Sequence, residues 1–313
     1  MKLDSVSNFM ERCGIPERDR YDLPSSDKKF PDGASYRIEI SGVEGPKVLE
    51  AIIKEKNRRN VPVHRVVSFC QGGTLFSDQE LKDFAQMAAE AKIEVIAIAG
   101  PRNAWDGGRQ AVTPEGQKSG GMHHRGCDEL RKVIADLYRM YEIGLRGFML
   151  VDMGLLDLVR QMQENGDFPK DVAIKLSVWA GVSSAAGARL AEKLGASSYN
   201  PIADLTLPQL AAMRQVTSIP IDYYIWTFES FGGTQRFYDA PEVARICSPC
   251  YFKFEPGPGS GLMYTPWSTD EEHMRLCEKK VKWAEWVINH IQENDPSINV
   301  SKQGPSDLHI PKI

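Results

Sequence analysis

The sequence predicts a single (β/α)8 barrel, and three observations point to it. Eight short apolar runs, each typical of a buried strand, recur along the chain with helical patterns between and after them. Strands that alternate with helices pair in parallel through βαβ crossovers. Eight such units in 313 residues match the size of a closed barrel. An open doubly wound sheet competes, but the turn after the first strand, residues 41–46, lacks the glycine fingerprint of a dinucleotide-binding unit.

The elements follow in order along the chain. The expected strands are Tyr36–Ile40, Val63–Phe69, Ile93–Ala99, Gly147–Val151, Val172–Val178, Ser198–Ile202, Ile219–Ile225 and Tyr251–Phe254. Helical spacing of apolar residues is clear from Leu130 to Tyr141 and again from 270 to 293. The barrel is therefore expected over 36–293, after an N-terminal extension over 1–35 and before an extended tail over 294–313. We expect the extension to cover either the barrel floor or a neighbouring subunit. Only the second arrangement would require a homo-oligomer, and the sequence leaves the oligomeric state open.

Composition excludes several classes of function. The formal net charge of −4 comes from mixed charges, so nucleic acid and anionic membranes are not expected partners. No run approaches the roughly 18 apolar residues that span a bilayer, and the N-terminus lacks the apolar core of a signal peptide. The six cysteines are scattered, which predicts reduced thiols and a cytoplasmic protein. The one CxxC, Cys247 to Cys250, is poor support for zinc or an iron–sulfur cluster.

One connection is unusually long. Gly100–Gly126 follows the third strand and is rich in glycine and in groups that recognise ligands. Loops of this length are typically functional or disordered, so we predict an active-site lid, with a solvated insertion as the alternative. Its candidates for substrate binding are Arg102, Arg109 and Arg125, and its candidate acids or bases are His123 and His124.

Polar residues at the carboxyl ends of barrel strands are typical of catalysis. Glu39, Asp152 and Glu255 are the candidate carboxylates. Lys175 and Lys253 lie inside apolar strands, where an unpaired ammonium costs several kcal/mol. Two readings of Lys175 stay open: a base or Schiff-base nucleophile, or a structural partner of a carboxylate. We expect Glu39, Asp152, Lys175 and Glu255 to project toward one cavity.

Further candidates concern substrate and metal. Asn200 lies on strand six and Trp226 follows strand seven, and glycine-rich turns with Gly232, Gly233 and Gly259 follow strands seven and eight. Bare backbone N–H groups in such turns bind phosphate or carboxylate in many barrels, although tight turns also need glycine for their own geometry. Converging carboxylates would suit a divalent metal such as Mg or Mn, but no HxH or HExxH spacing supports one.

Two stretches resemble the collagenase-like peptidase family U32. The opening IEISGVEGPKVLEAII is similar to that family's first βα unit, and the run from Ile174 through IPIDYYIWT is similar to its later strand–helix–strand segment. The resemblance implies a barrel, with Glu39, Asn200 and Asp204 at its mouth. The family's His-Gly pair and closely spaced cysteines are missing from WTFESFGGTQRFYDAP, so no iron–sulfur cluster is expected.

Two functions follow from these residues. The first, which follows the resemblance, is hydrolysis of an amide or peptide-like bond, with Glu39, Asp152 or Glu255 as base and a lid histidine as acid. The second is a lyase or isomerase that acts on a small phosphorylated or carboxylated substrate, with arginines holding the anion and Lys175 as base or nucleophile.

Overall fold

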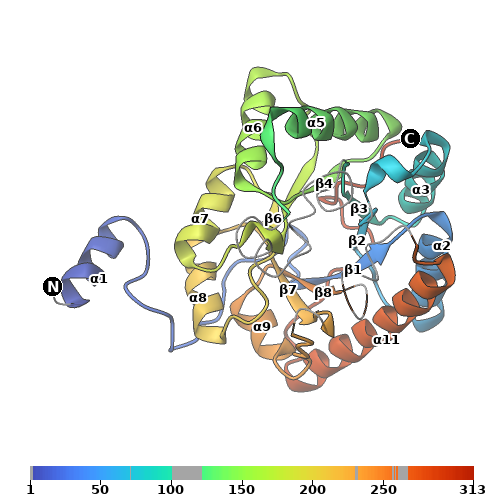
Figure 1. Cartoon of the computed structure of the whole chain (residues 1–313). Coiled ribbons are helices and arrows are strands. Elements are labelled where there is room, and N and C mark those ends of the chain that lie inside the picture. Colours follow the sequence, from blue (N-terminus) through green and yellow to red (C-terminus); the bar gives the residue numbers. More distant parts are fainter. Residues whose placement is uncertain are drawn as a thin grey trace.

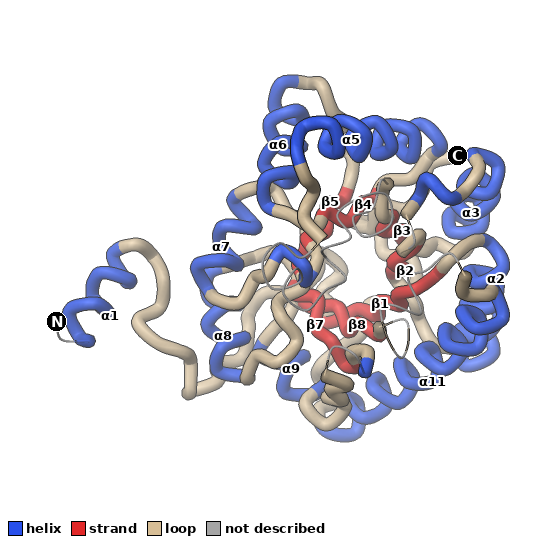
Figure 2. Tube along the Cα trace, viewed as in Figure 1, coloured by secondary structure: helices blue, strands red, loops and turns tan. Residues whose placement is uncertain are grey.

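The protein folds as a closed eight-stranded barrel (Figures 1 and 2). The computed structural model describes residues 3–70, 72–100, 122–229, 232–255, 257, 259 and 267–313. In these residues the strands close in chain order from β1 to β8, with β8 beside β1, and every pairing is parallel. Helices form a ring around the barrel, as Figure 2 shows. The predicted (β/α)8 barrel is confirmed.

The strands lie where the apolar runs predict them. They are β1 (Tyr36–Val43), β2 (Arg65–Ser68), β3 (Glu94–Ala97), β4 (Gly147–Leu150), β5 (Ala173–Leu176), β6 (Ser198–Tyr199), β7 (Ile221–Trp226) and β8 (Cys250–Phe254). Several are shorter than the runs because the ladder bonds end before the apolar residues do. β1 instead extends to Val43, and its register with β2 shifts between Ser41 and Val43, where Gly42 has a φ of 79°. Glycine tolerates that φ without steric cost.

The helices cover the outside of the barrel (Figure 1). They are α1 (Leu3–Arg12), α2 (Pro46–Arg59), α3 (Asp78–Glu90), α5 (Gly126–Ile143), α6 (Met153–Asn165), α7 (Ala185–Lys193), α8 (Leu207–Val216), α9 (Ala240–Ile246) and α11 (Asp270–Asn294). The predicted helix over 270–293 is therefore confirmed. Thr269 and Glu272 form a capping box at its start, which satisfies two backbone donors that the helix leaves without partners.

The apolar core lies between the strands and the helices rather than inside the barrel. Outward residues such as Ile38, Phe148 and Phe252 belong to one large cluster with buried helix residues. The apolar cluster inside is small and comprises Val67, Cys70, Ile96, Met149, Ala173 and Phe228. Because side chains alternate across a strand, the other inward positions are free to carry charges. The polar interior is what positions the candidate site.

Both ends of the chain contact the barrel, and one helix does not pack into it. Lys28 donates to the carbonyl of Thr217, and Phe30 packs edge-on to Tyr251. The tail over 294–313 has no helix but is bound to the barrel, with Ser301 N donating to Tyr36 O at 3.1 Å. The helix α1 has no buried residue and stands apart from the barrel in Figure 1.

Two further sequence predictions concern the long connection after strand three and the absence of a membrane-spanning run. Most of the predicted lid, residues 101–121, lies outside the described residues, so the lid stays a prediction. Among the helices of the described ranges, none is long and apolar enough to cross a membrane.

Candidate active site

A buried cluster of charges fills the middle of the barrel. Lys175 Nζ lies 2.6 Å from Glu39 Oε1 and 2.7 Å from Asp222 Oδ2, and all three side chains are fully buried. They come from β5, β1 and β7, so the cluster crosses the barrel axis. Ser198 donates to Asp222 Oδ2 at 2.9 Å from β6. Each charge therefore has close partners of opposite sign, as a buried ion pair requires.

Arg65 connects this layer to the barrel floor. Its guanidinium lies 3.5 Å from Glu39 and 3.4 Å from Asp222, and its Nε donates to Glu94. It also lies over the ring of Tyr251, 3.7 Å from the ring centroid. Five donors in one planar group allow Arg65 to bridge three carboxylates at once.

The pKa values reflect this pairing. Burial alone would raise the pKa of Glu39, but Lys175, Lys253 and Arg65 outweigh it and hold that pKa at about 2. Burial raises the pKa of Asp222 and lowers that of Lys175, in each case against the pull of the opposite charges. Glu39 is therefore held as a carboxylate by three cations around it.

A second group of charges lies toward the mouth. Lys253 Nζ, from β8, lies 3.4 Å from Glu39 Oε1, 3.6 Å from Glu255 Oε1 and 3.4 Å from Asn200 Oδ1. It also lies 5.3 Å from the ring centroid of Tyr224. Burial lowers the pKa of Lys253, but Glu255 and Glu39 outweigh it, so the pKa is raised. Lys253 is thus an ammonium ion at neutral pH.

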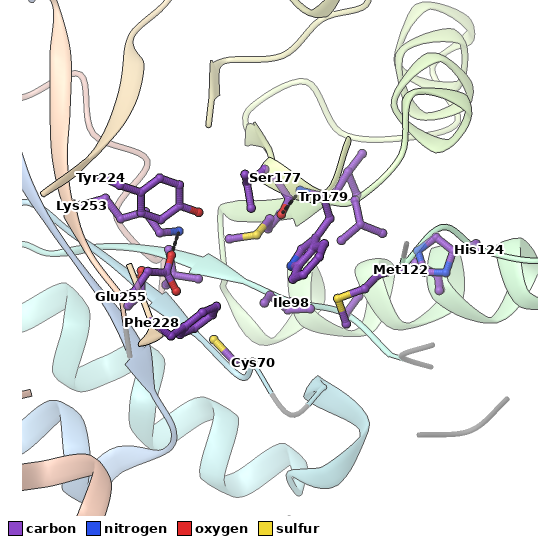
Figure 3. A pocket seen from close by; sticks show the side chains of 18 residues that line it. Cys70, Ile98, Met122, His124, Ser177, Trp179, Tyr224, Phe228, Lys253 and Glu255 are labelled. Atoms are coloured by element: carbon purple, nitrogen blue, oxygen red, sulfur yellow. Dashed lines mark hydrogen bonds and ion pairs between the residues drawn. The ribbon is translucent and has the colours of Figure 1, made fainter. Parts of the chain in front are cut away.

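A cavity of about 40 Å³ opens beside this second group (Figure 3). Its polar lining residues are Ser41, His124, Ser177, Tyr224, Lys253 and Glu255, and its walls are largely apolar, with Val67, Ile98, Met149, Val178 and Phe228. Figure 3 shows Tyr224, Lys253 and Glu255 at one end and His124 at the other, with Ile98 and Trp179 between them. The cavity lies at the carboxyl ends of the strands, where barrels carry their chemistry.

Two polar atoms of the cavity wall have no hydrogen-bond partner within the described part of the chain. They are Ser41 Oγ and His124 Nδ1, and both are buried. Burial lowers the pKa of His124, so this imidazole is neutral at pH 7. A buried polar atom without a partner costs about 1–3 kcal/mol, and an explanation for such an atom is that a ligand supplies the partner.

The four side chains expected to share one cavity do not do so. Glu255 lines the cavity, whereas Glu39 and Lys175 lie one layer below it in the charge cluster. Asp152 caps α6, where it accepts a hydrogen bond from Leu155 N at 2.6 Å, and it also accepts one from His124 N at 3.2 Å. Asp152 therefore positions the backbone of a cavity residue. A role for any of the four in catalysis stays a prediction.

The other predicted residues are more dispersed. His123 is exposed, with Nε2 lying 3.2 Å from Trp179 O, and Arg125 is exposed at the start of α5. Asn200 is fully buried and joins β6 to β7 by donating to Asp222 O at 2.7 Å. Trp226 stacks on Trp283 of α11, with ring centroids 4.8 Å apart, so its ring packs against a helix.

The structure describes the glycine-rich turn after β7 better than the one after β8. The N–H groups of Gly232 and Gly233 donate to Glu229 O and Phe228 O, so the turn itself uses the donors predicted for an anion. Gly259 lies between residues outside the described ranges. Arg102 and Arg109 lie outside the described ranges, and the roles predicted for Gly259, Arg102 and Arg109 stay predictions.

The divalent metal that the sequence left open has no support in this part of the structure. Within the described ranges, no group of three or more His, Cys, Asp or Glu side chains is arranged to hold a metal ion. Cys247 and Cys250 are buried free thiols, and burial raises the pKa of each. A protonated buried thiol is a core group rather than a ligand.

Sequence reasoning missed three members of the charge cluster. None of the three, Asp222, Arg65 and Glu94, is among the candidates selected from the sequence. The signal was present, because each is a charge inside an apolar run, as Lys175 is. A charge there must be paired across the barrel, so all inward charges belong in one candidate set.

Comparison with known proteins adds a family resemblance. The model of peptidase family U32 matches residues 123–228, which include His124, Asp152, Lys175 and Asn200. Glu39, Lys253 and Glu255 lie outside the match. A search of curated proteins found no match.

Solved structures share the barrel at low identity. The YdjI aldolase from Escherichia coli is 14% identical, with a TM-score of 0.47 over 85% of this chain and 94% of that one. The U32 peptidase Mk0906 is 16% identical, with a TM-score of 0.42 over 75% of this chain and 97% of that one. Such likeness concerns the fold alone. The resemblance to peptidase family U32 therefore rests on the matched segment, residues 123–228, about a third of the chain.

Proposed function

We propose that the protein is an enzyme that hydrolyses an amide or peptide-like bond at the barrel mouth. The observation that carries the proposal is the Lys253–Glu255 pair, whose Nζ and Oε1 lie 3.6 Å apart at the end of β8 and line the cavity. A cation beside a carboxylate is the arrangement that polarises a carbonyl group and activates water. The U32 match supports the same class of reaction.

The chemistry assigns one role to each side chain. Lys253, held as an ammonium ion, would donate to the carbonyl oxygen and stabilise the oxyanion that forms. Glu255 would take a proton from water as the water oxygen bonds to the carbonyl carbon. The same proton would then pass to the leaving nitrogen as the C–N bond breaks, which restores Glu255 as a carboxylate. Neutral His124 would bind the substrate at the far end of the cavity.

Two variants test the proposal. Lys253→Met should lower kcat/KM by about 10²–10³-fold for whichever amide or dipeptide the wild type hydrolyses, because this is the usual cost of removing an oxyanion donor. Glu255→Gln should cause a loss of about 10²–10⁴-fold, because it removes the base but keeps the shape. The assay is amine release from a panel of small amides and dipeptides. Lys132→Met, at an exposed position of α5 that does not line the cavity, is the matched control.

A second candidate is a lyase or isomerase that uses the same two groups. The observation that favours it is the cavity volume of about 40 Å³, which suits a small substrate better than a peptide. Glu255 would then remove a proton from the carbon next to the carbonyl, and Lys253 would stabilise the enolate. Deuterium uptake into a small ketone or ketoacid in D₂O, without amine release, would favour this reaction. Borohydride trapping should fail, because the raised pKa of Lys253 keeps its amine protonated.

A further inference from the structure

We infer that the mouth cavity selects a small substrate that is polar at both ends and apolar in the middle. This inference rests on the proposed function, in which Lys253 and Glu255 hold the reacting carbonyl or carboxylate group. What it adds is a second recognition point at His124 and a limit on length. The substrate class that fits is a short-chain oxo or carboxylic compound that carries a hydroxyl or similar group at the end remote from the reacting group.

The reacting end has three polar groups at one place. Lys253 lies on β8 and Glu255 directly follows that strand; their side chains lie 3.6 Å apart and both line the cavity. Ser41 lies two residues beyond Glu39 on β1, and Glu39 pairs in register with Lys253. Ser41 thus stands beside Lys253 and Glu255, with its buried Oγ lacking a partner in the described residues. It can donate to an oxygen that Lys253 also binds.

The middle of the cavity is lined largely by apolar side chains, with Ser177 as its polar member. Val67 of β2, Ile98 directly after β3 and Met149 of β4 form part of its wall, with Trp179 between the two ends in Figure 3. A polar group held there would lose most of its hydrogen bonds to water without replacement, at a cost of about 1–3 kcal/mol. A short run of CH or CH₂ groups fits this section, because its burial is favourable.

The far end has a defined polar requirement. His124 Nδ1 is buried without a partner in the described part of the chain, and the backbone N–H of the same residue is fixed by Asp152 Oδ2 at 3.2 Å. A ligand hydroxyl satisfies Nδ1 in either tautomer, because it both donates and accepts. A methyl group at the same place would leave the ring nitrogen unpaired.

The volume limits the length. A buried water molecule takes up roughly 10–15 Å³ of a cavity. A cavity of about 40 Å³ therefore holds about three groups of the size of water. Three CH₂ groups between the carboxylate and the far hydroxyl make 4-hydroxybutanoate, so we expect hydroxy acids of about three to five carbons to fit. Longer chains would have to extend out of the cavity.

The test compares isosteric pairs of acids as probes of the free protein. The pairs are 3-hydroxypropanoate with butanoate, 4-hydroxybutanoate with pentanoate, and 5-hydroxypentanoate with hexanoate, with affinities measured by ligand-observed NMR. At one chain length the hydroxy acid should bind about fivefold more tightly, the value of one typical hydrogen bond. His124→Phe should abolish that gain and leave the binding of the methyl-ended acid unchanged. Ser41→Ala should weaken both members of a pair equally, by about fivefold.

The outcomes separate this inference from the proposed function. Equal binding within every pair, a gain that persists in His124→Phe, or no binding of any probe at millimolar concentration would overturn the inference. If Lys253→Met abolishes acid binding while the pairs bind equally, the reacting end is upheld and only the far-end recognition fails. If Lys253→Met leaves acid binding unchanged, the proposed function fails with it. Thermal melts of each variant confirm that the protein is folded.

Discussion

The middle and mouth layers of the barrel both bury charges, but they pair them differently. In the middle, Lys175 contacts Glu39 and Asp222 at 2.6 and 2.7 Å, and none of the three is exposed. At the mouth, Lys253 lies 3.4–3.6 Å from its carboxylate neighbours, beside a cavity whose wall holds two polar atoms lacking partners in the described chain. A buried charge therefore marks a site only where nearby polar groups are still unsatisfied. Tight, complete pairing indicates a structural role instead.

The largest expected effect distinguishes the two layers by stability. Lys175→Met should lower the free energy of unfolding by about 3–5 kcal/mol, because it leaves Glu39 and Asp222 buried without their closest cation. Lys253→Met should cost only about 1–2 kcal/mol, since Glu39 keeps Lys175 and the longer contacts contribute less. Urea unfolding at neutral pH measures both.

Equal losses in the two variants would remove the distinction between the layers. If Lys175→Met were as stable as the wild type but inactive, the catalytic reading of Lys175 would stand. A double variant, Lys175→Met with Asp222→Asn, serves as the control: it removes one carboxylate charge and should recover part of the lost stability.

The fold was predictable because the spacing of apolar residues along the sequence reflects which faces of the strands and helices are buried. Runs such as Val172–Val178 are apolar on the outward face, where Ile174 and Leu176 pack against helices. The predicted bounds exceed the observed ones, as at Ser198–Tyr199, because the apolar pattern continues beyond the last ladder bond. The arrangement of the tail was not predictable. It is fixed by single polar contacts, such as that of Asp307 with Arg37, and single contacts leave no periodic pattern in the sequence.

The candidate site was predictable in kind but not in detail. Strand-end carboxylates and lysines were identified, yet partners are set by barrel geometry: Glu39 faces Lys175 of β5 across the axis, at a sequence separation of 136 residues. Sequence spacing cannot rank such distant partners. Nor can it show that Trp226 turns outward to stack on Trp283, because a register shift between Tyr224 and Trp226 changes the face.

The next effect compares His64, which is fully buried with both ring nitrogens hydrogen-bonded, with the half-buried His124 at the mouth. His64 Nδ1 accepts from Ile38 N at 3.0 Å and Nε2 donates to Ser301 O at 2.9 Å, so the neutral ring joins β1 to the tail. Burial lowers the pKa of His64 from 6.5 to about 4. The stability that neutral His64 contributes is complete above pH 6.5 and is lost as the pH falls toward 4. The reason is that, between these two values, His64 takes up a proton in the unfolded chain but not in the folded one. About 2–3 kcal/mol should be lost by pH 4.5.

His64→Gln removes the titration and should flatten that loss, although the variant starts less stable at pH 7. Part of the slope should remain, because burial also lowers the pKa of His273 to about 4. Unfolding free energies at pH 7, 6, 5 and 4.5 provide the measurement. A slope in His64→Gln as steep as in the wild type would show that other groups govern acid lability. His124→Phe, at the mouth, should change this slope less.

The smallest expected effect separates the floor from the mouth. Arg37 is 1% exposed and forms two bonds to Asp307 of the tail, at 2.8 and 2.7 Å. Asp307→Asn keeps the shape but removes the charge, and should cost about 1–2 kcal/mol, because hydrogen bonds to charged groups exceed neutral ones. The loss is limited, since Arg37 keeps Ser301 Oγ at 2.9 Å and the ring of Phe30. Binding of the acid probes at the mouth should stay within about twofold of the wild type, because additivity holds for distant sites. A parallel loss of probe binding would show instead that the charges through Arg65 couple the floor to the mouth, and the two regions would then act as one electrostatic unit.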